Sequence, residues 1–285
     1  MPSPSTPRPR RPQKPRPARP EPQERSALSG IPGGAKEPLG RDRATPTKGA
    51  PPRVKAASAP PPRPPFPADE TPQLARGVIK EIERIVGPGD RAKDLALALS
   101  IGSAAIEDGF TDVARQYLAW ARFHAPKVPP VREAYGVALY LDEAYESAVT
   151  ELQAYRRLTG RNDQNHLIAD CFRALNKPLD KIVEPLRDAF DDERVSPDRH
   201  AEACIVWASA LADAGDVASG RAVLRRYFER HPVAKRKEGA HDLRVRVVAA
   251  KLAEEAGDSK DAAAHRARIT AIDASYFDDE AEERF

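Results

Sequence analysis

The sequence predicts an all-α fold in which pairs of helices follow one another along the chain, after a disordered N-terminal tail. Three observations predict it. The first 68 residues hold 20 of the 29 prolines, and residue types recur at a spacing of 34 in the part that follows. In addition, no segment shows the period-two alternation with β-branched residues that is typical of strands.

The tail is predicted to span residues 1–68. It contains fourteen basic and four acidic residues, whereas the rest of the chain is net acidic. Proline fixes φ and removes a backbone donor, and the tail has too little apolar surface to offset the entropy of ordering. We therefore expect its proline runs, such as residues 60–65, to be extended rather than helical.

The folded domain is predicted to span residues 69–276, with the first helix starting near Thr71. Thr71 is a suitable N-cap, and Pro72 suits the first helical position. Apolar residues then recur at helical spacing from Ile79 to Val86, before a Gly-Pro-Gly stop at residues 87–89.

A repeat of 34 residues runs through the domain. Three residue types share this period: Gly102 with Gly136, Ala114 with Ala148, and Leu118 with Leu152 and Leu186. A helix pair of this length, with small residues at its eighth and twentieth positions, resembles the tetratricopeptide repeat (TPR) family. Laid on this chain, the pattern gives five units at 95–128, 129–162, 163–196, 201–234 and 243–276. The other interpretation is an Ala-rich helical bundle without repeats.

Units three and five depart from the family pattern. Unit three has Asp170 and Ile182 at the small-residue positions, and Pro185 inside its second helix. Because an interior proline kinks or splits a helix, we expect this unit to be distorted. Unit five has Arg266 where a large apolar residue belongs, which suits a terminal unit facing water.

Turn residues between the helices also fit the repeat. Asp216 and Asp258 each follow a glycine, and we expect both to be N-caps. His124 and His231 precede prolines near the ends of their units and are expected at helix C-termini.

The resemblance implies a right-handed α-solenoid whose first helices line a concave groove. The second, fifth, ninth and twelfth positions of the units would point into it. At the fifth, ninth and twelfth positions of units one to four, the residues are Leu99, Ser103, Ile106, Glu133, Val137, Tyr140, Leu167, Cys171, Ala174, Ile205, Ser209 and Ala212. Such a mainly apolar groove suits a helix or peptide of another protein. The alternative is that the chain's own termini or a second copy fill it.

No set of residues in the sequence indicates catalysis, a metal or a cofactor. Phosphate loops, dinucleotide-binding glycines and paired metal-binding histidines are all missing. Cys171 fits a small apolar filler better than a nucleophile, since no neighbouring base is implied. We therefore predict a non-catalytic scaffold without a small-molecule substrate.

A second hypothesis concerns the basic arm within the tail. The arm would associate with nucleic acid or ribonucleoprotein, or be attracted more weakly to acidic surfaces. At the other end, residues 277–285 form an acidic tail. The chain has no long apolar stretch and only two cysteines, so we expect a cytoplasmic protein without membrane contact. The arm consists of Arg8, Arg10, Arg11, Lys14, Arg16 and Arg19.

Overall fold

The fold is all-α, as the sequence predicts. The computed structural model describes residues 59–67, 70–233, 237–274 and 276, and within these ranges it contains helices and no strand. The helices are α1 (Arg76–Val86), α2 (Asp90–Glu107), α3 (Thr111–His124), α4 (Pro129–Leu141), α5 (Tyr145–Thr159), α6 (Asn165–Ala174), α7 (Leu179–Asp191), α8 (Pro197–Asp213), α9 (Val217–Arg230), α10 (Ala240–Glu255) and α11 (Ser259–Ile272).

The start of α1 differs from the prediction. Thr71 and Pro72 precede the helix, which begins at Arg76 with Ala75 as its N-cap. In the segment before the helix, the backbone N–H of Gln73 donates to Ser100 Oγ on α2 at 2.8 Å, so a tertiary contact is made where the sequence predicts the first helical turn.

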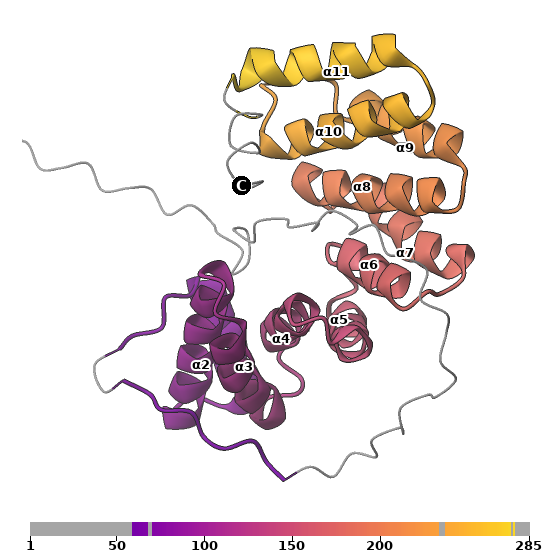
Figure 1. Ribbon diagram of the computed structural model, residues 1–285. Helices are drawn as coiled ribbons and strands as arrows, with labels where there is room; N and C mark the ends of the chain where they lie inside the picture. Colours follow the sequence, from indigo (N-terminus) through magenta and orange to yellow (C-terminus); the bar gives the residue numbers. More distant parts are fainter. Residues whose placement is uncertain (1–58, 68–69, 234–236, 275, 277–285) are drawn as a thin grey trace, which may run out of the picture.

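From α2 onward the helices form five pairs, each joined by a turn of three or four residues. The pairs are α2–α3, α4–α5, α6–α7, α8–α9 and α10–α11, in the order of the five predicted units. We call the leading member of each pair a first helix and the other a second helix. Every second helix up to α9 also packs against the first helix of the next pair. Figure 1 shows the pairs following one another along an arc, from α2–α3 at lower left to α10–α11 at the top.

Small residues allow close contact within three of the pairs. A Cβ atom added at Gly102 would lie 2.5 Å from Leu118 Cγ, and one added at Gly136 would lie 2.7 Å from Leu152 Cδ2. At Gly220 the added atom would lie 2.8 Å from the backbone oxygen of Ala208. These contacts occur at the eighth, twentieth and twenty-fourth positions of the units, where the repeat places small and large residues.

The turn inside each pair also repeats. The fifteenth residue has a positive φ in four units: Gly109 (79°), Glu143 (59°), Gly215 (87°) and Gly257 (75°). Glycine adopts this left-handed conformation without strain, which explains three of the four. The side chains of Asp216 and Asp258 then accept hydrogen bonds from the N–H groups of Ser219 and Asp261, so both predicted N-caps are confirmed.

The second helix of unit three is continuous at Pro185, where the sequence predicts a kink or a break. Helix α7 runs from Leu179 to Asp191 with Pro185 inside it, so the proline does not split the helix. Asn165 on α6 donates from Nδ2 to the Pro185 carbonyl oxygen at 2.9 Å, which ties α6 to α7. The departure lies in α6, which has ten residues and is the shortest helix among the five pairs.

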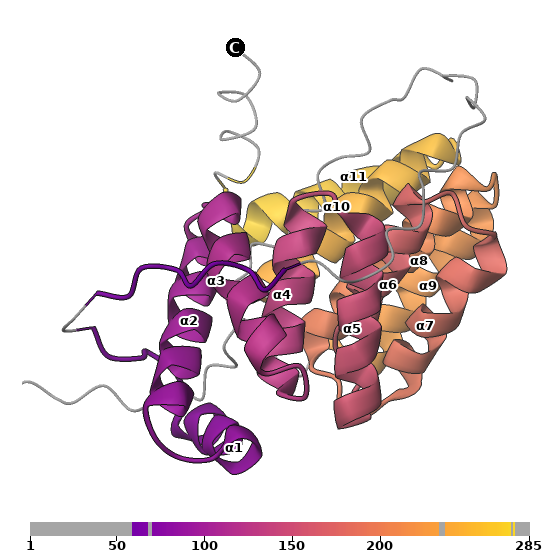
Figure 2. The same ribbon diagram turned by 90° about the horizontal axis from the view of Figure 1, so that it is seen from below.

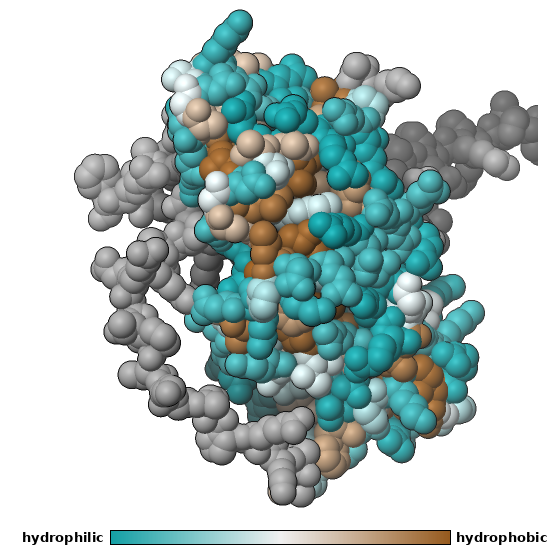
Figure 3. Space-filling view, turned by 90° about the vertical axis from the view of Figure 1, so that its right-hand side faces the viewer, coloured by the Kyte–Doolittle hydropathy of each residue, from teal (hydrophilic) through white to brown (hydrophobic). Residues whose placement is uncertain are grey.

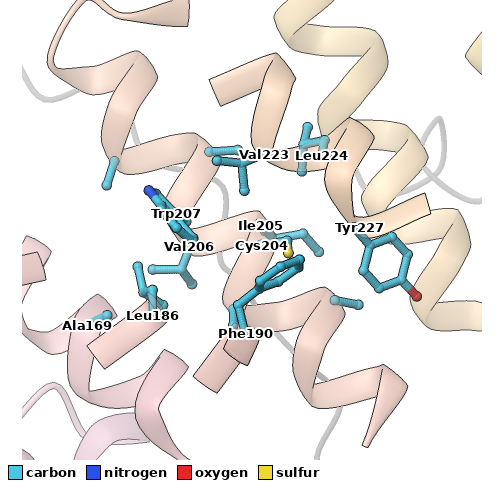
Figure 4. Close-up of a cluster of buried hydrophobic side chains, with 14 of the residues drawn as sticks. Ala169, Leu186, Phe190, Cys204, Ile205, Val206, Trp207, Val223, Leu224 and Tyr227 are labelled. Carbon is cyan, nitrogen blue, oxygen red and sulfur yellow. The ribbon is translucent and has the colours of Figure 1, made fainter. Parts of the chain in front are cut away.

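The core is divided into two large clusters. The first joins α1 to α4 and includes Leu95, Leu118 and Trp120. The second joins α6 to α10 around Phe190 and Trp207 (Figure 4). A small cluster of Leu139, Ala148 and Cys171 lies between them, on α4, α5 and α6.

The face of the molecule drawn in Figure 3 is mostly hydrophilic, with a local exception. Figure 3 shows apolar side chains gathered on the upper half of one side of the molecule, where the C-terminal helix pairs lie. Among the helices that the structure describes, none has the length and apolarity needed to cross a bilayer.

Candidate interaction face

The residues predicted to line a groove lie on the first helices α2, α4, α6 and α8. Six of them are buried within the chain: Leu99, Ser103, Ile106, Val137, Cys171 and Ile205. A partner cannot contact these side chains while the helices keep their packing. The half-buried ones are Glu133, Tyr140, Leu167, Ala174, Ser209 and Ala212.

The face of the first helices carries polar side chains that bond from one helix to the next. On α4, the Glu133 Oε1 atom accepts a hydrogen bond of 2.6 Å from Gln164 Nε2, at the start of α6. Burial raises the pKa of Glu133 to about 7, although the Gln164 hydrogen bond opposes the shift. The two residues therefore form a hydrogen bond between α4 and α6 that carries little charge at pH values well below 7.

The same row continues from α6 to α10. His166 Nε2 lies 3.4 Å from Arg199 Nη1 on α8, and burial with the nearby Arg199 charge holds the pKa of His166 well below its ordinary value. Further along, Arg244 Nη1 on α10 pairs with Glu202 Oε1 on α8 at 2.6 Å. Burial raises the pKa of Glu202, and the Arg244 and Arg199 charges lower it. We call the residues Glu133, Gln164, His166, Arg199, Glu202 and Arg244 the first polar row.

A second polar row crosses α4, α6 and α8 closer to their C-terminal ends. Tyr140 donates its hydroxyl to Asp170 Oδ2 at 2.7 Å, and Arg173 Nη1 pairs with Asp170 Oδ1 at 2.6 Å. Arg173 Nη2 also lies 3.0 Å from Asp213 Oδ2 on α8. Asp170 thus belongs to a polar network, which explains a charged residue at an eighth position.

Most residues of these rows are absent from the groove predicted by the sequence. That prediction named Glu133 and Tyr140 and described the groove as mainly apolar, whereas the face also carries charged groups from α6, α8 and α10. The sequence holds one signal for them, because Gln164, Glu202 and Arg244 occupy the second position of units three, four and five. The resemblance to the TPR family implies that the second position faces inward.

Chemically, the two rows orient and tie the helices, and they present hydrogen-bonding groups beside small residues. Within the described part of the chain, no three His, Cys, Asp or Glu side chains gather as a metal site requires. Both cysteines are buried, and burial raises the pKa of Cys204 to about 12. At neutral pH its thiol therefore stays protonated.

The charged ends of the sequence lie outside the described residues. This applies to the acidic tail at 277–285 and to the basic arm, so an association of the arm with nucleic acid stays a prediction. The arm residues concerned are Arg8, Arg10, Arg11, Lys14, Arg16 and Arg19.

No protein-family model matches the chain, and no match is found among curated proteins.

Proposed function

We propose that the chain is a non-catalytic interaction module, a TPR-like α-solenoid whose first-helix face binds a segment of another protein. Two features of the fold support the solenoid. Each helix pair packs on the next in chain order, and the close contacts at Gly102 and Gly136 fall at equivalent positions of consecutive units. In such an array each unit contacts its neighbours, and a continuous surface for binding results.

The observation that carries the proposed binding is the side-chain pairing across consecutive first helices. Tyr140, Asp170 and Arg173 link α4, α6 and α8 through side-chain hydrogen bonds and ion pairs. The same helices α6 and α8 carry the half-buried small residues Ala174 and Ser209. The face therefore suits a partner segment that offers hydrogen-bonding groups together with apolar side chains, rather than a purely apolar one.

The test places bulk on this face without touching the core. Ala174→Arg with Ser209→Arg puts two long, charged side chains on α6 and α8, where a bound segment would lie. Ala263→Arg on the exposed side of α11 is the matched control. Wild-type chain and both variants serve as baits, and the recovered proteins are quantified by mass spectrometry.

We expect a partner that the wild type and the control recover equally and that the double variant loses by at least tenfold. Circular dichroism and thermal melting establish that the double variant is folded. Equal recovery by all three baits would show that the first-helix face is not the binding surface.

A further inference from the structure

Residues 59–67, which we call the strap, lie across α2 and α3 in the first core cluster. The strap has the sequence Ala-Pro-Pro-Pro-Arg-Pro-Pro-Phe-Pro and forms no helix or strand. Figure 2 shows it as a tube that passes over α3. Pro64 is buried, and Phe66 packs against the first core cluster.

Aromatic side chains of α3 hold the strap. The ring of Phe66 meets Tyr117 and Trp120 edge-on, with centroids 5.8 and 5.5 Å apart. The Tyr117 hydroxyl donates a hydrogen bond of 2.5 Å to the Pro65 carbonyl oxygen. Burial, with a smaller contribution from the Glu70 carboxylate, raises the pKa of Tyr117, so this hydroxyl remains a donor. The strap is thus held by ring contacts and by a bond to its backbone.

An acidic residue on α2 pairs with the only charged residue of the strap. Arg63 Nη2 lies 2.8 Å from Asp94 Oδ2, and the guanidinium carbon lies 5.0 Å from the centroid of the Phe66 ring. A charge pair next to an aromatic surface fixes the direction in which an extended segment lies.

Proline-rich segments are bound by this combination of aromatic rings, a donor to a peptide carbonyl and a group for one flanking charge. We propose that the α2–α3 surface is a receptor for proline-rich segments of the form Arg-Pro-Pro-aromatic, and that it binds such a segment of another protein when the strap is displaced. The site consists of Asp94, Tyr117 and Trp120. It lies apart from the polar rows, so it does not depend on the function proposed above.

The contacts of the strap permit its replacement by another proline-rich segment. Arg63 is 61% exposed, and ion pairs this open to water contribute little to stability. Pro62, Pro65 and Pro67 are also exposed. A tethered ligand acts at an effective concentration on the order of 1 mM. If the strap itself binds with an intrinsic dissociation constant of about 0.1 mM, it weakens the apparent affinity of any competing segment roughly tenfold.

The test uses the full chain and a fluorescent peptide with the sequence of residues 59–67. Phe66→Ala removes the ring contacts of the strap and leaves the α2–α3 surface intact. We expect the peptide to bind this variant about tenfold more tightly than the wild type, measured by fluorescence anisotropy. No saturable binding to Phe66→Ala would overturn the proposal. If that variant does not fold, Arg63→Glu takes its place, because a carboxylate at position 63 would repel Asp94 and so displace the strap without changing a buried side chain.

Two further variants test the contacts assigned to the site. Adding Tyr117→Phe to the Phe66→Ala chain keeps the ring and removes the donor, and should weaken peptide binding several-fold. Adding Asp94→Lys instead should weaken binding of the native peptide. It should strengthen binding of a peptide that has Glu in place of Arg63. If neither change alters the affinity for the peptide, the assigned site is contradicted.

A second copy of the chain is the alternative source of the bound segment, and it is tested as well. Sedimentation of the wild type over a range of concentrations should show no dimer that depends on the strap. A dimer that forms in the wild type and disappears in Phe66→Ala would show exchange of straps between copies. That result would replace the assignment to another protein.

Discussion

Single atoms decide how closely the helices approach. At Gly220 an added Cβ would lie 2.8 Å from the Ala208 carbonyl oxygen, which is backbone and cannot rotate away. Gly220→Ala should therefore destabilise the chain by about 1–2 kcal/mol, although alanine favours helix, because overpacking outweighs that gain. Gly77→Ala is the control, since nothing lies within 4 Å of its added Cβ. It should leave stability unchanged or raise it by up to about 1 kcal/mol in urea denaturation.

Glu133 should make stability depend on pH. Its folded pKa of about 7 lies above the ordinary 4.5 because the carboxyl group is buried. The folded state therefore binds the proton more tightly than the unfolded state, and this contribution is lost as the pH rises from about 4.5 through 7. A shift of this size corresponds to roughly 3 kcal/mol.

Glu133→Gln cannot ionise, so its stability relative to wild type should increase between pH 5 and 8. Urea denaturation of both chains at several pH values checks this. The nearby charges of Asp163, Arg199 and Arg161 are present in both proteins, so the difference isolates Glu133. A constant difference over this range would mean that Glu133 is already charged at pH 5.

At the scale of the element, the second helices depend on their N-caps to different extents. Asp216 caps α9 alone, whereas Asp258 caps α11 and also pairs with Arg221 Nη2 on α9 at 2.7 Å. Both changes to alanine should lower the melting temperature, because each leaves a helix N–H without its acceptor. Asp258→Ala should lower it more, since Arg221 then keeps only Asp261 as a carboxylate partner. Equal losses would show that the Arg221 pair contributes nothing.

Element boundaries also show what local sequence signals can predict. The turn glycines and the caps Asp216 and Asp258 could be predicted, since their signals lie within a few residues of the atoms they contact. The start of α1 was predicted wrongly from its local signals, and the segment before it contacts Ser100, 27 residues from Gln73. Pro185 illustrates the opposite case, in which a strong breaker signal is overruled by packing between α6 and α7.

At the scale of the molecule, the sequence predicts the order of the helix pairs better than the face they present. The 34-residue period predicts where the helix pairs fall, and the inward-facing positions are only what the resemblance to the TPR family implies. The period does not indicate that Leu99 and Val137 are covered by neighbouring helices, or that Arg173 reaches Asp213, 40 residues away. Such pairings depend on the angle between successive pairs, which no local pattern encodes. The strap contact was missed for the same reason, since Pro65 and Tyr117 lie 52 residues apart.

The division of the core gives the chain two natural spectroscopic reporters. Trp120 belongs to the first cluster and Trp207 to the second, and the sequence contains no other tryptophan. Chains that keep a single indole, through Trp207→Phe or Trp120→Phe, should give coincident unfolding curves, because neighbouring helix pairs are coupled through the small cluster around Leu139. Leu139→Ala should separate the curves by loosening that link. The two halves of the molecule would then melt as separate cooperative blocks, each followed by the emission of its own indole.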